Sequence, residues 1–203
     1  MNTIMKTTVD SQYEVRLMKQ KKGYLLLFKT NENRIGILYK ISAALYVQNW
    51  NIIEMSATTS DDGIIEDTFL VEPMEKRLAY IMEYTLLRSI HTLLKGNSTV
   101  MGYISRYPGK LRGLDLSKKQ FRKLEVNVRT GNQFELMIET DDRPGLIFEI
   151  TQILYRLYFD ILKMESQTMG NKAVDKILVA REAGKESKYD SQILAEALDK
   201  IVD

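Results

Sequence analysis

The sequence predicts an α+β protein built from two tandem two-layer sandwiches, each an antiparallel sheet with helices on one face. Three observations predict this fold. The chain repeats itself after 109 residues, each repeat alternates strand-like runs with helical apolar stripes, and Gly, Asn or Asp residues separate the runs. The 203 residues are 44% apolar and 28% charged, a balance typical of a globular protein that can build a substantial core.

The internal repeat carries most of this prediction. Arg34 and Gly36 correspond to Arg143 and Gly145 at a shift of 109 residues. Further identities follow in the same order, with one deletion before the last two pairs: Ile41 and Ile150, Leu45 and Leu154, Tyr46 and Tyr155, Ile52 and Ile161, Met55 and Met164, Thr59 and Thr168, Asp67 and Asp175, Val71 and Val179. This period is far longer than the ~20–50 residues of solenoid units, so it indicates a duplicated domain.

Each repeat is expected to fold in the order strand, strand, helix, strand, strand, helix. The strands are predicted, from their residue types and the turn residues between them, over 13–19, 24–30, 52–59 and 64–71, and over 124–129, 133–140, 161–168 and 173–180. The closing helices are predicted over about 75–95 and about 188–201. The segment 100–106 is compatible with a further strand.

The first helix of each repeat is predicted from the spacing of its apolar residues. Ile37, Ile41 and Leu45 have helical spacing in the first repeat, and Leu146, Ile150 and Leu154 have it in the second. Helices of this spacing on an antiparallel sheet indicate a ferredoxin-like sandwich. Ile41, Leu45, Ile150 and Leu154 are expected to be buried. Because such a sheet leaves an edge strand, the two copies are expected to lie side by side or to form a homodimer.

The expected organisation is a first domain over 13–95, a basic linker over 96–122 and a second domain over 123–203. The segment 105–123 has seven basic residues against Asp115 alone. Such a segment is compatible with a nucleic-acid contact. Its breakers, Pro108, Gly109 and Gly113, favour a solvated linker, and nucleic acid is therefore not the expected partner.

The composition excludes several classes of protein. The absence of Cys excludes disulfides and thiolate metal sites, and the single His91 excludes a two-histidine metal site, so neither a metal nor a cofactor is expected. No phosphate-binding glycine loop, dinucleotide fingerprint or nucleophile elbow is present, so we expect no catalytic activity. No apolar run approaches ~18 residues and the start has no signal-like stretch, so a cytoplasmic protein without a membrane contact is expected.

Three motifs resemble the ACT domain family. They are the turns 33–36 and 142–145, the Asn51-Ile52 and Asp160-Ile161 pairs, and the run 67–71. The second copy is most similar to the C-terminal ACT pair of PII uridylyltransferases, and the first to the serine-sensing ACT domain of phosphoglycerate dehydrogenases. The resemblance implies regulation by a small amino acid bound between two ACT units.

The residue types at these turns also fit an amino-acid ligand on physical grounds. A glycine turn that opens a helix leaves backbone N–H groups free for a carboxylate, and amide side chains suit the remaining charged groups. The candidate ligand-binding residues are Asn33, Arg34, Gly36, Ile37, Asn51, Asp142, Arg143, Gly145, Leu146 and Asp160. An alternative remains open in which Asn33 and Asp142 are simple helix caps and Asn51 and Asp160 are ordinary polar residues at strand starts.

The resemblance to ACT domains further implies that the ligand is held by the glycine turn of one unit and the second-strand residue of its neighbour, so each site combines residues from both copies if the two copies pair with each other. Asn33 and Gly36 are then expected to face Asp160, while Asp142 and Gly145 face Asn51. In the first site a helix N-terminus meets an acid, which suits a zwitterion. In the second site the charge of Asp142 competes with a ligand carboxylate, so one working site of the two is predicted.

The sequence therefore predicts an amino-acid-sensing regulatory protein that signals by a change of conformation or assembly. Two alternatives stay open. One is a ligand-free interaction module that contacts a regulated protein, and the other is a detached regulatory part of a PII-uridylyltransferase-like system.

Overall fold

The structure is a computed structural model that describes residues 3–9, 12–32, 34–60, 62–75, 78–96, 98–111 and 123–202. The strands are β1 Thr3–Val9, β2 Tyr13–Lys19, β3 Tyr24–Thr30, β4 Trp50–Thr59, β5 Ile65–Pro73, β6 Lys123–Val128, β7 Gln133–Asp141, β8 Phe159–Met169 and β9 Lys172–Arg181. The helices are α1 Ile37–Val47, α2 Ala79–Leu94, α3 Val100–Ile104, α4 Pro108–Leu111, α5 Leu146–Arg156 and α6 Asp190–Val202.

The described strands form a single antiparallel sheet in the order β1-β2-β3-β5-β4-β8-β9-β7-β6. The two ferredoxin-like halves join where β4 pairs with β8, in a register from Glu54 opposite Gln167 to Thr58 opposite Lys163. The expectation that the two copies lie side by side is confirmed. We call the half from β1 to α4 unit 1 and the half from β6 to α6 unit 2.

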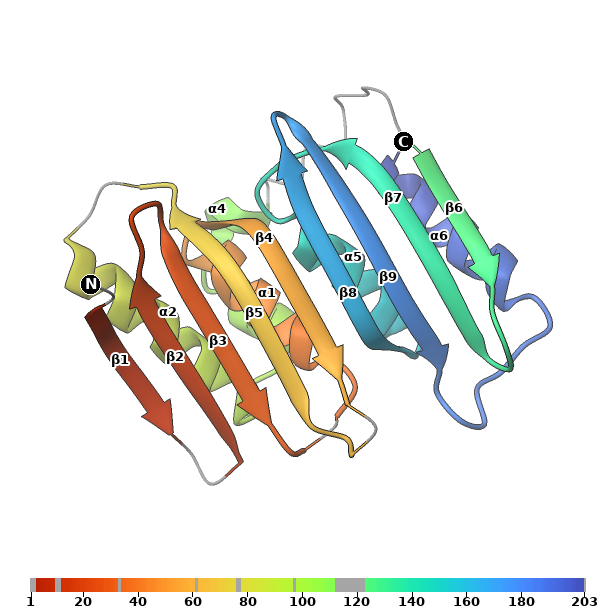
Figure 1. The fold of residues 1–203 in the computed structure, drawn as a ribbon, viewed down its shortest axis with the longest axis horizontal. Helices are drawn as coiled ribbons and strands as arrows, with labels where there is room; N and C mark the ends of the chain where they lie inside the picture. The colour runs from red at the N-terminus through yellow and green to blue at the C-terminus, as the bar shows by residue number, and fades with distance from the viewer. Residues whose placement is uncertain are drawn as a thin grey trace.

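The helices cover one face of this sheet, as Figure 1 shows. α1 and α5 contact each other at the centre of the helix layer. Ile41, Ile150 and Leu154 are fully buried and Leu45 is 1% exposed, so the predicted core positions are confirmed. Burial alternates along the strands, because successive side chains of a strand point to opposite faces of a sheet.

The segment 100–106, considered a possible strand, is helical instead. Thr99 begins α3, and its side-chain oxygen accepts a hydrogen bond from the backbone N–H of Gly102. Val100, Tyr103 and Ile104 are buried, and this i, i+3, i+4 spacing fits a helix that packs against α1.

Two features of the fold lie outside the domains expected from the sequence. Strand β1 precedes residue 13 and pairs with β2. The stretch expected to be a linker contains α3 and α4, and the hydroxyl of Tyr46 donates to the backbone oxygen of Lys110 in α4 at 2.6 Å. Most of the basic segment, residues 112–122, lies outside the described residues.

Candidate functional site: two pockets between the units

Two small cavities related by the internal repeat lie between the units. Pocket A is formed by the start of α1 with the start of β8, and its lining includes Arg34, Gly36, Ile37, Asp67, Tyr155 and Asp160. Pocket B is formed by the start of α5 with the start of β4, and its lining includes Tyr46, Asn51, Asp142, Arg143, Gly145 and Leu146. Their volumes are about 30 Å³ and about 20 Å³, which is room for about one water molecule each.

A tyrosine from the opposite unit covers the glycine of each pocket. Gly36 has φ +90°, and a Cβ built there would lie 2.6 Å from the ring of Tyr155. Gly145 has φ +87°, and its Cβ would lie 2.7 Å from the ring of Tyr46. Both the left-handed backbone and the adjoining ring therefore require glycine.

These glycines, and not Asn33 or Asp142, stand at the N-cap positions of α1 and α5, and neither helix has a side-chain cap. The interpretation of Asp142 as a simple cap is therefore wrong. Its backbone N–H instead donates to the carbonyl of Asn171 in the β8–β9 turn. Asn33 lies outside the described residues.

A row of stacked aromatic rings connects the two pockets across the α1–α5 interface. Tyr155 stacks on Tyr39 at 5.0 Å between centroids, Tyr39 on Phe148 at 5.7 Å, and Phe148 on Tyr46 at 5.4 Å. Tyr39 and Phe148 occupy equivalent positions of the repeat, as do Tyr46 and Tyr155. The row therefore has the approximate twofold symmetry of the duplication.

A buried polar contact lies at the same interface. The hydroxyls of Ser42 and Thr151, again equivalent positions, are 3.0 Å apart and completely buried within α1 and α5. The two helices thus pack through matched residues of the repeat.

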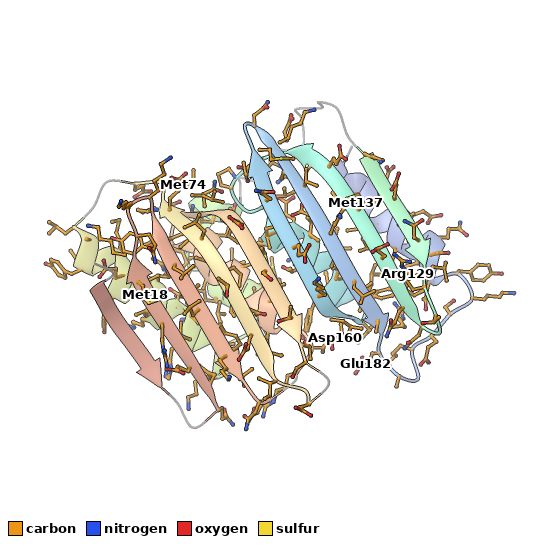
Figure 2. The ribbon with its side chains drawn as sticks, viewed as in Figure 1. Met18, Met74, Arg129, Met137, Asp160 and Glu182 are labelled. Carbon is orange, nitrogen blue, oxygen red and sulfur yellow. The ribbon has the colours of Figure 1, made fainter. Side chains whose placement is uncertain are left out.

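Two acidic residues, one from each unit, line pocket A. Asp160 is half-buried at the start of β8 (Figure 2), and burial raises the pKa of its carboxyl. Asp67 of β5 is 3% exposed, and burial raises the pKa of its carboxyl to about 7 although the Thr58 backbone N–H donates to it. Arg34, the basic residue of this lining, forms an ion pair with Glu32 at 2.6 Å.

The charges of pocket B are arranged differently. Arg143 is held by two hydrogen bonds to Glu149, at 2.6 and 2.5 Å. Asp175, the equivalent of Asp67, is fully buried behind Ser166, and burial raises the pKa of its carboxyl to about 7. A side-chain hydrogen bond with Ser166 acts against this rise in the pKa, and the negative charge of Asp142 adds to it.

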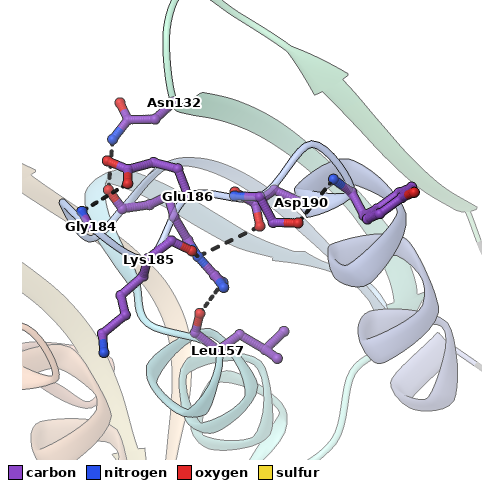
Figure 3. Close-up of polar contacts among 9 residues, drawn as sticks. Asn132, Leu157, Gly184, Lys185, Glu186 and Asp190 are labelled. Carbon is purple, nitrogen blue, oxygen red and sulfur yellow. Dashed lines mark hydrogen bonds and ion pairs between the residues drawn. The ribbon is translucent and has the colours of Figure 1, made fainter.

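Figure 3 shows a cluster of polar contacts that includes Leu157, Lys185 and Asp190. The Arg181 guanidinium donates to the carbonyls of Leu157 and Lys185, and lies 3.6 Å from the buried Asp190. It also lies over the ring of Phe159, 4.6 Å from the centroid. These contacts join the end of α5, the start of β8 and the loop before α6, so the backbone at Asp160 is fixed on several sides.

The predicted site residues thus divide between the two pockets. Arg34, Gly36 and Ile37 share pocket A with Asp160. Pocket B brings together the remaining predicted residues that the structure describes: Asn51, Asp142, Arg143, Gly145 and Leu146. Sequence reasoning missed the roles of Tyr46, Tyr155 and Asp67. All three are identical at equivalent positions of the repeat, and this identity was the available signal.

The chain is similar in sequence to two curated enzymes, while no family model matches it. It is 24% identical over 178 residues to the bifunctional uridylyltransferase/uridylyl-removing enzyme of Rhodospirillum rubrum, which covers 82% of the chain and 18% of that protein. It is 21% identical over 164 residues to the enzyme of the same name from Pasteurella multocida, covering 76% and 18%. The chain therefore spans less than a fifth of the length of these relatives.

Two solved structures resemble the chain at low sequence identity. They are aspartate kinase from Synechocystis, with a TM-score of 0.45, 13% identity and coverage of 88% and 26%, and a putative glycine cleavage system transcriptional repressor, with a TM-score of 0.29, 16% identity and coverage of 86% and 91%. Over the described part of the chain, no helix is long and apolar enough to span a membrane, and no cluster of three or more metal-ligating side chains occurs.

Proposed function

We propose that this protein is a non-catalytic, ACT-type regulator that senses a small amino acid in pocket A. The observation that carries the proposal is the meeting of the α1 N-terminus with Asp160 across the unit interface. Backbone N–H groups at the start of α1 suit a ligand carboxylate, and the carboxylate of Asp160 suits its ammonium group. The sequence motifs shared with ACT domains, and the similarity to part of the uridylyltransferases, support this proposal.

Pocket A is the better candidate of the two because its cover can open. Tyr155 is 41% exposed, and its hydroxyl forms no hydrogen bond within the described part of the chain. In pocket B, Tyr46 is 6% exposed and is held by α4, while Asp142 brings negative charge to the place where a carboxylate would bind. A ligand enters pocket A by displacing the Tyr155 ring, since the cavity of about 30 Å³ has room for only about one water molecule.

Displacement of Tyr155 supplies a route for the signal. Tyr155 stacks on Tyr39, and the aromatic row continues to Tyr46, which contacts α4. A ligand that moves the first ring thus acts on the packing of α1 against α5 and on the segment that joins the units. The output of the sensor is then a change of conformation or assembly that a partner protein reads.

Calorimetric titration of the full chain with each of the twenty amino acids tests this proposal. We expect one chemical class to bind, and Asp160→Asn to weaken it about five- to thirtyfold, which corresponds to about 1–2 kcal/mol. Asn33→Ala is expected to weaken binding in the same direction, whereas Asp142→Asn in pocket B leaves it unchanged. Failure of all twenty to bind, or loss of affinity in Asp142→Asn alone, contradicts the proposal.

A second candidate function is a ligand-free interaction module. It is favoured by the small size of both closed cavities and by an exposed apolar face on and before α2, where Leu78, Tyr80 and Ile81 are 61%, 63% and 38% exposed. The titration separates the two functions, because the module binds none of the amino acids.

A further inference from the structure

We propose that the amino acid of pocket A carries a second positive charge on its side chain, and that Asp67 selects it. This inference rests on the function proposed above and deepens it. It names the ligand as a basic amino acid and assigns a specificity-determining role to a residue that the sequence motifs left without one.

Asp67 lies in the pocket and not merely near it. It stands on the helix-facing side of β5, between the buried Ile65 and Phe69, and lines the same cavity as Gly36 and Asp160. Apolar neighbours at these positions are ordinary core residues, whereas a carboxyl group there is costly unless it is paired.

The Asp67 carboxyl has no cationic partner among the residues that the structure describes. A backbone N–H of Thr58 donates to it, and no Lys, Arg or His of the described residues forms an ion pair with it. Arg34, the basic residue of the pocket lining, has a 66% exposed side chain and is engaged by Glu32. Burial raises the pKa of this carboxyl to about 7, so a cation that enters the cavity can stabilise its ionised form by forming an ion pair with it.

A count of charges identifies the ligand class. The pocket offers a helix N-terminus for one carboxylate, Asp160 for one ammonium group and Asp67 for a second cation. A basic amino acid matches all three, because its α-carboxylate, α-ammonium and side-chain cation each find an opposite charge. An amino acid with a neutral side chain leaves the Asp67 carboxyl as it is in the unliganded protein and gains no ion pair from it.

The second unit supplies a matched control. Asp175 is equivalent to Asp67 in the repeat and buried to the same degree, and burial raises the pKa of both carboxyls to about 7. Asp175 is paired with Ser166 across β8 and β9, and the lining of pocket B includes Ser166 and Ala173 but not Asp175. Substitution of either aspartate therefore perturbs the fold in a similar way, but only Asp67 is presented to the ligand of pocket A.

The experiment compares L-lysine with L-norleucine, which has the same chain length without the terminal ammonium group. Calorimetric titration of the full chain is expected to show lysine binding at least tenfold more tightly. In Asp67→Asn this preference falls to less than about threefold, and in Asp175→Asn it persists. If Asp67→Asn does not fold, the affinities of the two ligands for the unmodified chain still decide whether the pocket recognises a side-chain cation.

The pH dependence gives an independent readout. The lysine cation binds the ionised form of Asp67, so its affinity is expected to rise between pH 6 and pH 8 by up to about tenfold for each pH unit below the pKa. The other charged groups lining this pocket are Arg34 and Asp160, and the remaining titratable groups are Tyr39 and Tyr155. The Asp160→Asn variant is expected to keep this pH dependence, and the Asp67→Asn variant to lose it.

Two results would overturn the inference in distinguishable ways. If a neutral amino acid binds, and Asp160→Asn weakens it while lysine binds no more tightly than norleucine, the charge selection is wrong and the sensing function stands. If no amino acid binds at all, the proposed function fails and the inference fails with it.

Discussion

Pockets A and B are built from the same elements of a duplicated fold, yet they differ in how firmly they are closed. Tyr46 over pocket B donates to the Lys110 carbonyl at 2.6 Å, and the Lys110 ammonium group lies 5.1 Å from its ring centroid. Among the described residues, Tyr155 over pocket A stacks on Tyr39 and lies against Gly36, its hydroxyl forms no hydrogen bond, and it is 41% exposed. Two equivalent tyrosines thus act as a fixed cover in one pocket and a movable cover in the other.

The difference arises from the segment between the units. α4 is the last helix of unit 1, directly before the segment that leads to unit 2. The carbonyl of its Lys110 accepts a hydrogen bond from Tyr46, and the Lys110 ammonium group donates to the side chain of Asn49, which in turn donates to Glu75. A connecting segment occurs once between two units, so it can cover only one of two equivalent pockets. A duplicated protein can therefore become asymmetric in function without a change in the fold of either unit.

The largest expected effect tests whether the two units are equally well packed. Leu45 and Leu154 are equivalent and almost completely buried, so Leu45→Ala and Leu154→Ala should each lower the free energy of unfolding by about 2–5 kcal/mol. Urea unfolding measures this. A loss below about 1 kcal/mol in one unit only would mean that the asymmetry extends into the core.

The next effect concerns the two buried aspartates. Because burial raises the pKa of Asp67 and of Asp175 from 3.8 to about 7, the folded state holds a proton that the unfolded state releases. Stability is therefore greatest below the unfolded pKa and is lost as the pH rises through 7, by about 3 kcal/mol per group between pH 5 and pH 8.

The variants Asp67→Asn and Asp175→Asn should each remove about half of this loss and be more stable than the unmodified chain at pH 8. Urea unfolding at the two pH values measures the effect. A flat stability profile in the unmodified chain would show that these carboxyls are ionised and solvated.

The glycine positions test the covers directly. Ala at Gly36 or Gly145 costs about 1–2 kcal/mol because φ is positive at both. At Gly145 the new methyl group also meets the fixed Tyr46, so Gly145→Ala should exceed Gly36→Ala by about 1–3 kcal/mol, whereas Tyr155 can move aside. Thermal and urea unfolding of the two variants give the difference, and equal losses would mean that both rings are equally free.

The smallest expected effect isolates one hydrogen bond. Tyr46→Phe removes the bond to the Lys110 carbonyl and should cost about 0.5–1.5 kcal/mol. Tyr155→Phe, its counterpart, should be neutral within error, since its hydroxyl has no partner among the described residues. A measurable loss in Tyr155→Phe would show that the cover of pocket A is held in solution as well.

Much of the fold could be predicted because the signals are local. The hairpins follow from alternating apolar residues and turn glycines. The first helix of each repeat follows from the apolar stripes at 37–45 and 146–154. In these elements the local preference of the sequence agrees with the tertiary structure. The segment 100–106 was misjudged because a short run of Val, Met, Tyr and Ile is ambiguous between strand and helix. Its burial against α1 decided the matter, and that depends on the rest of the chain.

By itself, the sequence determined the duplication and the order of elements, because these follow from repeated residue types and short-range geometry. Only the tertiary structure decided which side chains cover the two glycines and which buried acid lines pocket A. Tyr155 reaches Gly36 across the α1–α5 interface, and Asp67 reaches the same cavity from the middle of β5. These contacts join residues far apart in the chain, and helix packing and sheet register, which no local pattern encodes, bring them together.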